Sequence, residues 1–145
     1  MDLTGKSILL VEDDELDVIS VQRSLNKIDL SIKLYTVYNG VEALALLRGE
    51  AEEKMDDLPE IILLDLNMPR MNGIEFLEEL RKDKKFQKIK VFVMTTSNDD
   101  KDRRETEKLG ISGYIIKPLN FNENTKKSSS MENFMHFQIL KILGQ

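Results

Sequence analysis

The sequence predicts an α/β fold in which a five-stranded parallel sheet carries helices on both faces. Five short apolar runs alternate with five segments of helical character along the chain. Residues 61–64 are continuously apolar between Pro59 and Pro69, as in strands buried on both faces of a parallel sheet. Short right-handed crossovers between such strands favour a doubly wound sheet with strand order 2-1-3-4-5.

The individual elements follow from local patterns. The predicted strands are residues 7–11, 33–37, 61–64, 91–94 and 114–116. A first helix is expected over 15–27, because Asp14 can cap it. Asn39 and Gly40 predict a turn, and a second helix follows with apolar residues at 41, 44 and 47. Residues 49–57 are charged and aperiodic, which predicts a solvated connector. Further helices are expected from 74 to 80, over the highly charged 99–109, and over 130–143.

Length and composition predict one domain and restrict its partners. A chain of 145 residues is expected to form a single unit, with strand-helix repeats over 7–118, a polar linker at 120–129 and a last helix over 130–143. Only 28 residues follow Lys117, too few for an attached output domain. The net charge of −5 argues against nucleic-acid binding. No apolar run approaches the roughly 20 residues that span a bilayer, and there is no cysteine, so we expect a cytoplasmic protein without membrane contact.

The last predicted helix carries two sets of apolar residues. One set forms a stripe at helical spacing and is expected to face the core: Met131, Phe134, Met135, Ile139, Ile142 and Leu143. Phe137 and Leu140 fall outside this stripe. They predict a second apolar patch that contacts another chain, for instance in a homodimer through the face of the fifth strand and the last helix.

Polar residues at the ends of the strands predict the chemistry. Glu12 and Asp13 follow the first strand and Asp65 follows the third, so all three are expected to meet in the crevice where the strand order reverses. Three carboxylates in one crevice repel each other unless a hard cation lies among them, and Mg²⁺ prefers such oxygen ligands. Thr95 and Lys117 end the fourth and fifth strands, where a hydroxyl and an ammonium can reach an oxygen near Asp65. These groups suit phosphoryl transfer to an aspartate.

Four motifs resemble the receiver domains of two-component response regulators, over essentially the whole chain. They are Val-Glu-Asp-Asp at 11–14, Leu-Asp-Leu-Asn-Met-Pro-Arg-Met-Asn-Gly at 64–73, Met-Thr-Thr-Ser at 94–97 and Gly-Tyr-Ile-Ile-Lys-Pro at 113–118. The resemblance implies a flavodoxin-like receiver fold with Asp65 as the phosphoacceptor. It implies the following further roles: Glu12, Asp13 and the backbone carbonyl of Asn67 for Mg²⁺, Thr95 as the switch hydroxyl, Tyr114 as the aromatic that moves with it, and Lys117 as the phosphate-sensing amine.

The function implied by this resemblance is that of a stand-alone signalling switch. A sensor histidine kinase would donate the phosphoryl group, and the protein would catalyse only its own phosphorylation and dephosphorylation. A downstream protein or a histidine phosphotransfer protein would receive the signal. The connector before the third strand, together with the motif at 64–73, is similar to the small response regulators that pair with bacterial phytochrome kinases.

Two alternatives from other classes are considered. A phosphorylation-independent binding module of the same fold would normally lack part of the acidic pair, the acceptor or the lysine, and all of these are present. A phosphatase of the haloacid dehalogenase type would carry a second Asp two positions after the nucleophile. This chain has Asn67 there.

Overall fold

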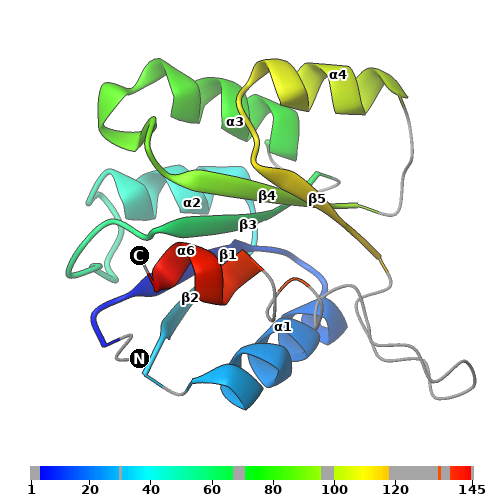
Figure 1. The fold of residues 1–145 in the computed structure, drawn as a ribbon. Coiled ribbons are helices and arrows are strands. Elements are labelled where there is room, and N and C mark those ends of the chain that lie inside the picture. Colours follow the sequence, from blue (N-terminus) through cyan, green and yellow to red (C-terminus); the bar gives the residue numbers. More distant parts are fainter. Residues whose placement is uncertain are drawn as a thin grey trace, which may run out of the picture.

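Five parallel strands form one sheet in the order β2-β1-β3-β4-β5 (Figure 1). The computed structural model describes residues 4–29, 31–66, 71–95, 100–117, 134 and 138–144. The strands are β1 (Ser7–Val11), β2 (Lys33–Val37), β3 (Ile61–Asp65), β4 (Lys90–Thr95) and β5 (Gly113–Ile116). The predicted doubly wound fold and its strand order are therefore confirmed. Asp65 is the last residue of β3 rather than the residue that follows it, whereas Thr95 ends β4 as expected.

Helices flank this sheet on both sides, as predicted. They are α1 (Glu15–Ile28), α2 (Gly40–Leu47), α3 (Gly73–Lys82), the short 3₁₀ helix η1 (Lys84–Phe86), α4 (Asp100–Lys108) and α6 (Leu140–Leu143). The turn predicted at Asn39 and Gly40 is instead the start of α2, because the Asn39 side chain accepts a hydrogen bond from the backbone N–H of Glu42 and caps the helix. Among the described residues, no helix is long and apolar enough to cross a membrane.

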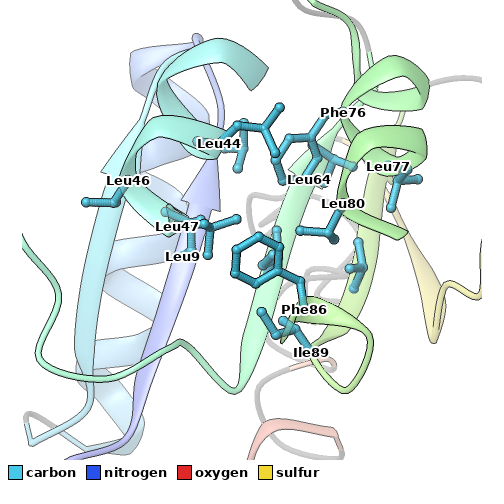
Figure 2. Packing of buried hydrophobic residues seen from close by; sticks show 14 of the residues in the cluster. Leu9, Leu44, Leu46, Leu47, Leu64, Phe76, Leu77, Leu80, Phe86 and Ile89 are labelled. Carbon is cyan, nitrogen blue, oxygen red and sulfur yellow. The ribbon is translucent and has the colours of Figure 1, made fainter. Parts of the chain in front are cut away.

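Successive residues of each strand point to opposite sides of the sheet and build two separate cores. Leu9 and Val11 face a cluster that includes Leu44 of α2 and Phe76 of α3 (Figure 2). Ile8 and Leu10 face a second cluster, to which α1 contributes Val21 and Leu25 and the C-terminal segment contributes Phe134, Ile139 and Leu143. The central strands are buried on both sides of the sheet, so close packing fixes the backbone at their carboxyl ends. Side chains at these ends therefore start from a rigid backbone.

Side-chain caps hold the starts of the helices nearest the strand ends. Asp14 accepts from the backbone N–H groups of Leu16 and Asp17 at 2.9 and 3.4 Å and caps α1 as predicted. Asn72 and Glu75 form a reciprocal capping box at the start of α3. The loops after β1 and β3 therefore lead into rigid first turns.

Arg81, near the end of α3, joins two connecting segments. Its guanidinium donates hydrogen bonds to the carbonyls of five residues: Phe86, Gln87, Ile89, Leu109 and Gly110. These carbonyls belong to the segment between α3 and β4 and to the turn after α4. One side chain thus satisfies loop carbonyls that lack a partner in the sheet.

Two glycines allow close backbone approaches next to the loop that follows Asp65. A Cβ on Gly73 would lie 2.7 Å from the Cα of Leu66, and the N–H of Gly73 donates to the carbonyl of Leu66 at 3.0 Å. A Cβ on Gly40 would lie 2.9 Å from Cγ of Met71. Met71 has a φ of 76°, a left-handed conformation that is strained for a side chain of this kind.

The C-terminal segment differs in part from the prediction. Phe134, Ile139 and Leu143 are buried as expected, but Leu140 is half-buried against the same core instead of lying outside it. The core-facing surface of this segment is therefore wider than the predicted stripe. Phe137, the linker 120–129 and the other residues between 130 and 137 lie outside the described residues, so the predicted apolar patch is not tested.

Candidate functional site

The predicted acidic residues, the hydroxyl and the lysine that the structure describes lie at the carboxyl end of the sheet. Glu12 and Asp13 follow β1, Asp65 ends β3 and Thr95 ends β4. Lys117 comes directly after β5, where its backbone N–H donates to the carbonyl of Thr95 at 3.0 Å. The crevice between β1 and β3 is the point at which the strand order reverses, as expected.

Three carboxylates meet in this crevice. Glu12, Asp13 and Asp65 each offer one oxygen, and these oxygens all lie within 4.8 Å of one another. Glu12 is fully buried and Asp65 is 4% exposed, whereas Asp13 is open to solvent. Burial raises the pKa of Glu12 from 4.5 to about 8, reinforced by a hydrogen bond that the protonated Glu12 carboxyl group donates to Asp65 and by the negative charge of Asp65, although Lys117 acts in the opposite direction. The site without a cation therefore retains a proton among its acids at neutral pH.

The ammonium of Lys117 lies among these acids. Its Nζ is 2.7 Å from Oε1 of Glu12, 2.8 Å from Oδ2 of Asp17 and 3.7 Å from Oδ1 of Asp65. Burial alone lowers the pKa of Lys117, but hydrogen bonds to Asp17 and Glu12 and the charge of Asp65 outweigh it, so the pKa is raised. Lys117 thus remains a cation beside the candidate acceptor.

Asp17 belongs to this site and was not predicted from the sequence. It lies in the first turn of α1, and its ion pair with Lys117 is largely shielded from solvent, with side-chain exposures of 16% and 12%. The signal that could have found it is its spacing: Asp17 is four residues after Asp13, in the first turn of a helix that starts at the site.

Tyr114 is held by α4 on the side of the sheet that also carries Thr95. Tyr114 pairs with Val93 in the β4-β5 register, and Val93 and Thr95 point to the same face. The Tyr114 hydroxyl is hydrogen-bonded to the hydroxyl of Thr106 and donates to the carbonyl of Arg103, whose guanidinium lies 4.9 Å from the ring centroid. Tyr114 therefore links β5 to a helix that is otherwise almost entirely charged.

The donor set fits a divalent cation. The three carboxylate oxygens lie within 4.8 Å of one another, and two of the side chains are almost inaccessible to solvent. All three groups can be ionised together only if a strong positive charge offsets their mutual repulsion. Oxygen ligands without nitrogen or sulfur favour hard cations. Asn67, whose carbonyl was predicted as a further ligand, lies outside the described residues.

A parallel sheet that gathers acids, a hydroxyl and a lysine at its strand ends defines the class of phosphoacceptor signalling domains. The family model "Response regulator receiver domain" matches residues 8–128. The chain therefore belongs to the response regulator receiver family of two-component signalling systems.

Known relatives agree with this assignment. The chain is 33% identical to response regulator Rcp1 of Synechocystis over 129 residues, which cover 89% of this chain and 88% of Rcp1. A Mn²⁺-bound structure of Rcp1 has a TM-score of 0.79 at 32% identity, with 91% and 93% of the two chains covered.

Two other solved structures are similar over nearly their whole length. The phosphorylated cyanobacterial phytochrome response regulator RcpA has a TM-score of 0.82 at 32% identity, with 94% of this chain and 95% of RcpA covered. A two-component response regulator from Legionella pneumophila has a TM-score of 0.77 at 42% identity, with coverages of 94% and 98%. The expected similarity to phytochrome-associated regulators is thus confirmed.

Proposed function

We propose that Asp65 accepts a phosphoryl group from a sensor histidine kinase in a Mg²⁺-dependent reaction, and that the phosphorylated protein changes its protein contacts. The observation that carries this proposal is the arrangement around Asp65. The buried acceptor carboxylate has the Lys117 ammonium at 3.7 Å and two further carboxylates within 4.8 Å.

Each side chain has a defined task in the proposed transfer. A carboxylate oxygen of Asp65 forms a bond to phosphorus while the bond from phosphorus to the kinase histidine nitrogen breaks, which yields an acyl phosphate on Asp65 and a free imidazole. Lys117 offsets the charge of the phosphoryl oxygens. Glu12, Asp13 and Asp65 would hold Mg²⁺, which would neutralise charge on the phosphoryl group when bound.

The proposed change of state involves the last two β/α units. A phosphoryl group on Asp65 offers new contacts to the Thr95 hydroxyl and to Lys117, at the ends of β4 and β5. Tyr114 lies on the same face as Thr95 and is bonded to α4. A movement of Thr95 would therefore reach α4 through Tyr114, which makes the α4 surface a suitable output.

The partners follow from the family and its relatives. Response regulators work with histidine kinases, and the phytochrome association of RcpA supports a phytochrome-type kinase as the donor for this chain. A downstream protein or a histidine phosphotransfer protein would receive the signal, with a homodimer through β5 and the last helix as a further state. We also propose that the protein acts as a stand-alone regulator in the cytoplasm.

The test is phosphorylation by a small donor. Incubation with acetyl phosphate and Mg²⁺ is expected to add one phosphoryl group, measured by intact mass, and hydroxylamine is expected to remove it because acyl phosphates are labile to this nucleophile. Asp65→Asn and metal chelation should both abolish the addition. Modification that persists in Asp65→Asn would refute the assignment of the acceptor.

A further inference from the structure

The Lys117 ammonium is held closer to a helix residue than to the candidate phosphoacceptor. Its Nζ lies 2.8 Å from the Asp17 carboxylate and 3.7 Å from that of Asp65. Only the first of these distances is that of a charged hydrogen bond. In this state Lys117 therefore gives direct bonds to Asp17 and, at 2.7 Å, to Glu12, and only a longer-range attraction to Asp65. Glu12 belongs to the crevice itself, so Asp17 is the bond that draws the ammonium toward α1.

The backbone around Asp17 is fixed by the cap of α1. Asp14 accepts from the N–H groups of Leu16 and Asp17, so the first turn of the helix cannot fray away from the strand end. Asp17 does not belong to the three acids whose oxygens converge within 4.8 Å. Its carboxylate is thus a separate anchor for Lys117, set on the helix side of the site.

The low exposure of the pair makes this anchor effective. With exposures of 16% for Asp17 and 12% for Lys117, little water or salt can screen their attraction. A negative charge at this place also repels an incoming anionic phosphoryl donor. Both effects oppose the transfer of a phosphoryl group to Asp65.

We propose that Asp17 is a positioning residue that holds Lys117 back from Asp65 and thereby slows phosphorylation. This inference depends on the proposed function of Asp65. When the acyl phosphate forms, Lys117 exchanges the Asp17 carboxylate for a phosphoryl oxygen. Because coupling is reciprocal, phosphorylation also releases the first turn of α1 from β5.

The experiment measures phosphorylation by acetyl phosphate and Mg²⁺ in the full chain, followed over time by intact mass. In this reaction an Asp65 oxygen bonds to phosphorus, the bond from phosphorus to the acetyl oxygen breaks and acetate leaves. Asp17→Asn should raise the rate roughly fivefold, the factor expected when one ion pair no longer competes. Asp17→Glu, which keeps a carboxylate, should return the rate toward that of the unmodified chain.

Two controls separate positioning from general charge. Glu15→Gln removes one negative charge from the same exposed turn without touching Lys117 in the described structure, and should change the rate less than about twofold. In a Lys117→Met background, Asp17→Asn should have no larger effect than Glu15→Gln. Mg²⁺ affinity, measured by calorimetry, lets the rates be compared at equal cation occupancy, since Lys117 released by Asp17→Asn lies beside two of the three converging acids.

Specific results would overturn the inference. An unchanged or lower rate in Asp17→Asn, an equal rise in Glu15→Gln, or a full effect without Lys117 would each refute the role of Asp17 while leaving Asp65 as the acceptor. If the unmodified chain takes up no phosphoryl group at all, the proposed function fails instead, and the role of Asp17 fails with it.

Discussion

Asp65→Asn is expected to make the metal-free protein more stable while it abolishes phosphoacceptance. The change keeps the size and shape of the side chain and removes one buried negative charge from the acid cluster. The unfolded chain has no comparable crowding of charge. The substitution therefore acts mainly on the folded state.

The size of the effect follows from the distances. At an effective dielectric constant of about 20, a charge within 4.8 Å repels the Asp65 carboxylate by about 3.5 kcal/mol or more, and Lys117 at 3.7 Å attracts it by about 4.5 kcal/mol. Protonation of Glu12 and the exposure of Asp13 to solvent both weaken the repulsion that these residues exert on Asp65. The remaining repulsion of the Asp65 carboxylate nearly cancels its attraction to Lys117. What remains is the cost of burying the charge, and we expect a gain of about 1–3 kcal/mol in the free energy of unfolding.

Thermal unfolding followed by circular dichroism in EDTA measures this gain as a rise in Tm of roughly 3–8 °C. Asp57→Asn, in the exposed connector, is the matched control and should leave Tm nearly unchanged. Saturating Mg²⁺ should reduce or reverse the difference, because only the unmodified chain keeps all three carboxylates for the cation. A lower Tm for Asp65→Asn in EDTA would refute the view that these acids are in electrostatic conflict.

Three other outcomes are expected. The pKa of Glu12 is raised from 4.5 to about 8 in the folded state. Between these pH values the metal-free folded state therefore binds a proton that the unfolded chain does not. The free energy of unfolding should fall as pH rises through this range, by at most about 1.4 kcal/mol per pH unit. The difference between the unmodified chain and Glu12→Gln isolates this slope, and Mg²⁺ affinity should rise over the same range and level off above it. Arg81→Met removes a donor from five carbonyls, of which only that of Phe86 keeps a backbone donor among the described residues, the N–H of Ile89. The change should cost about 2–4 kcal/mol in urea unfolding, whereas a loss below about 1 kcal/mol would contradict the role of Arg81. Thr106→Val removes a hydroxyl bonded to Tyr114 and should speed hydrogen exchange in α4; unchanged exchange there would argue that this bond does not anchor the helix.

The fold could be predicted because its signals are local. Continuous apolar runs ended by polar residues identify buried strands, and their order follows from general rules of handedness. The meeting of Glu12, Asp13 and Asp65 follows from that topology alone, since residues after neighbouring parallel strands must share one edge. Even the highly charged α4 was expected, because it lies between two clear strands.

The contacts that could not be predicted depend on where long side chains extend. Lys117 reaches Asp17 across the site, and no periodic pattern in the sequence records which of several nearby acids it contacts. The bonds of Arg81 depend on the directions of loop carbonyls, which are set by the tertiary structure. Leu140 was placed outside the core because its position falls outside the apolar stripe, but helical spacing does not record how wide a surface the sheet covers.

The contact between Gly40 and Met71 has a mechanical consequence. The start of α2 leaves no room for a side chain beside Met71, whose left-handed backbone conformation is strained. A side chain at position 40 would force Met71 to move, so the first turn of α2 is fitted to a residue of the segment that follows Asp65. A shift of Met71 would press on α2 without involving β4 or β5.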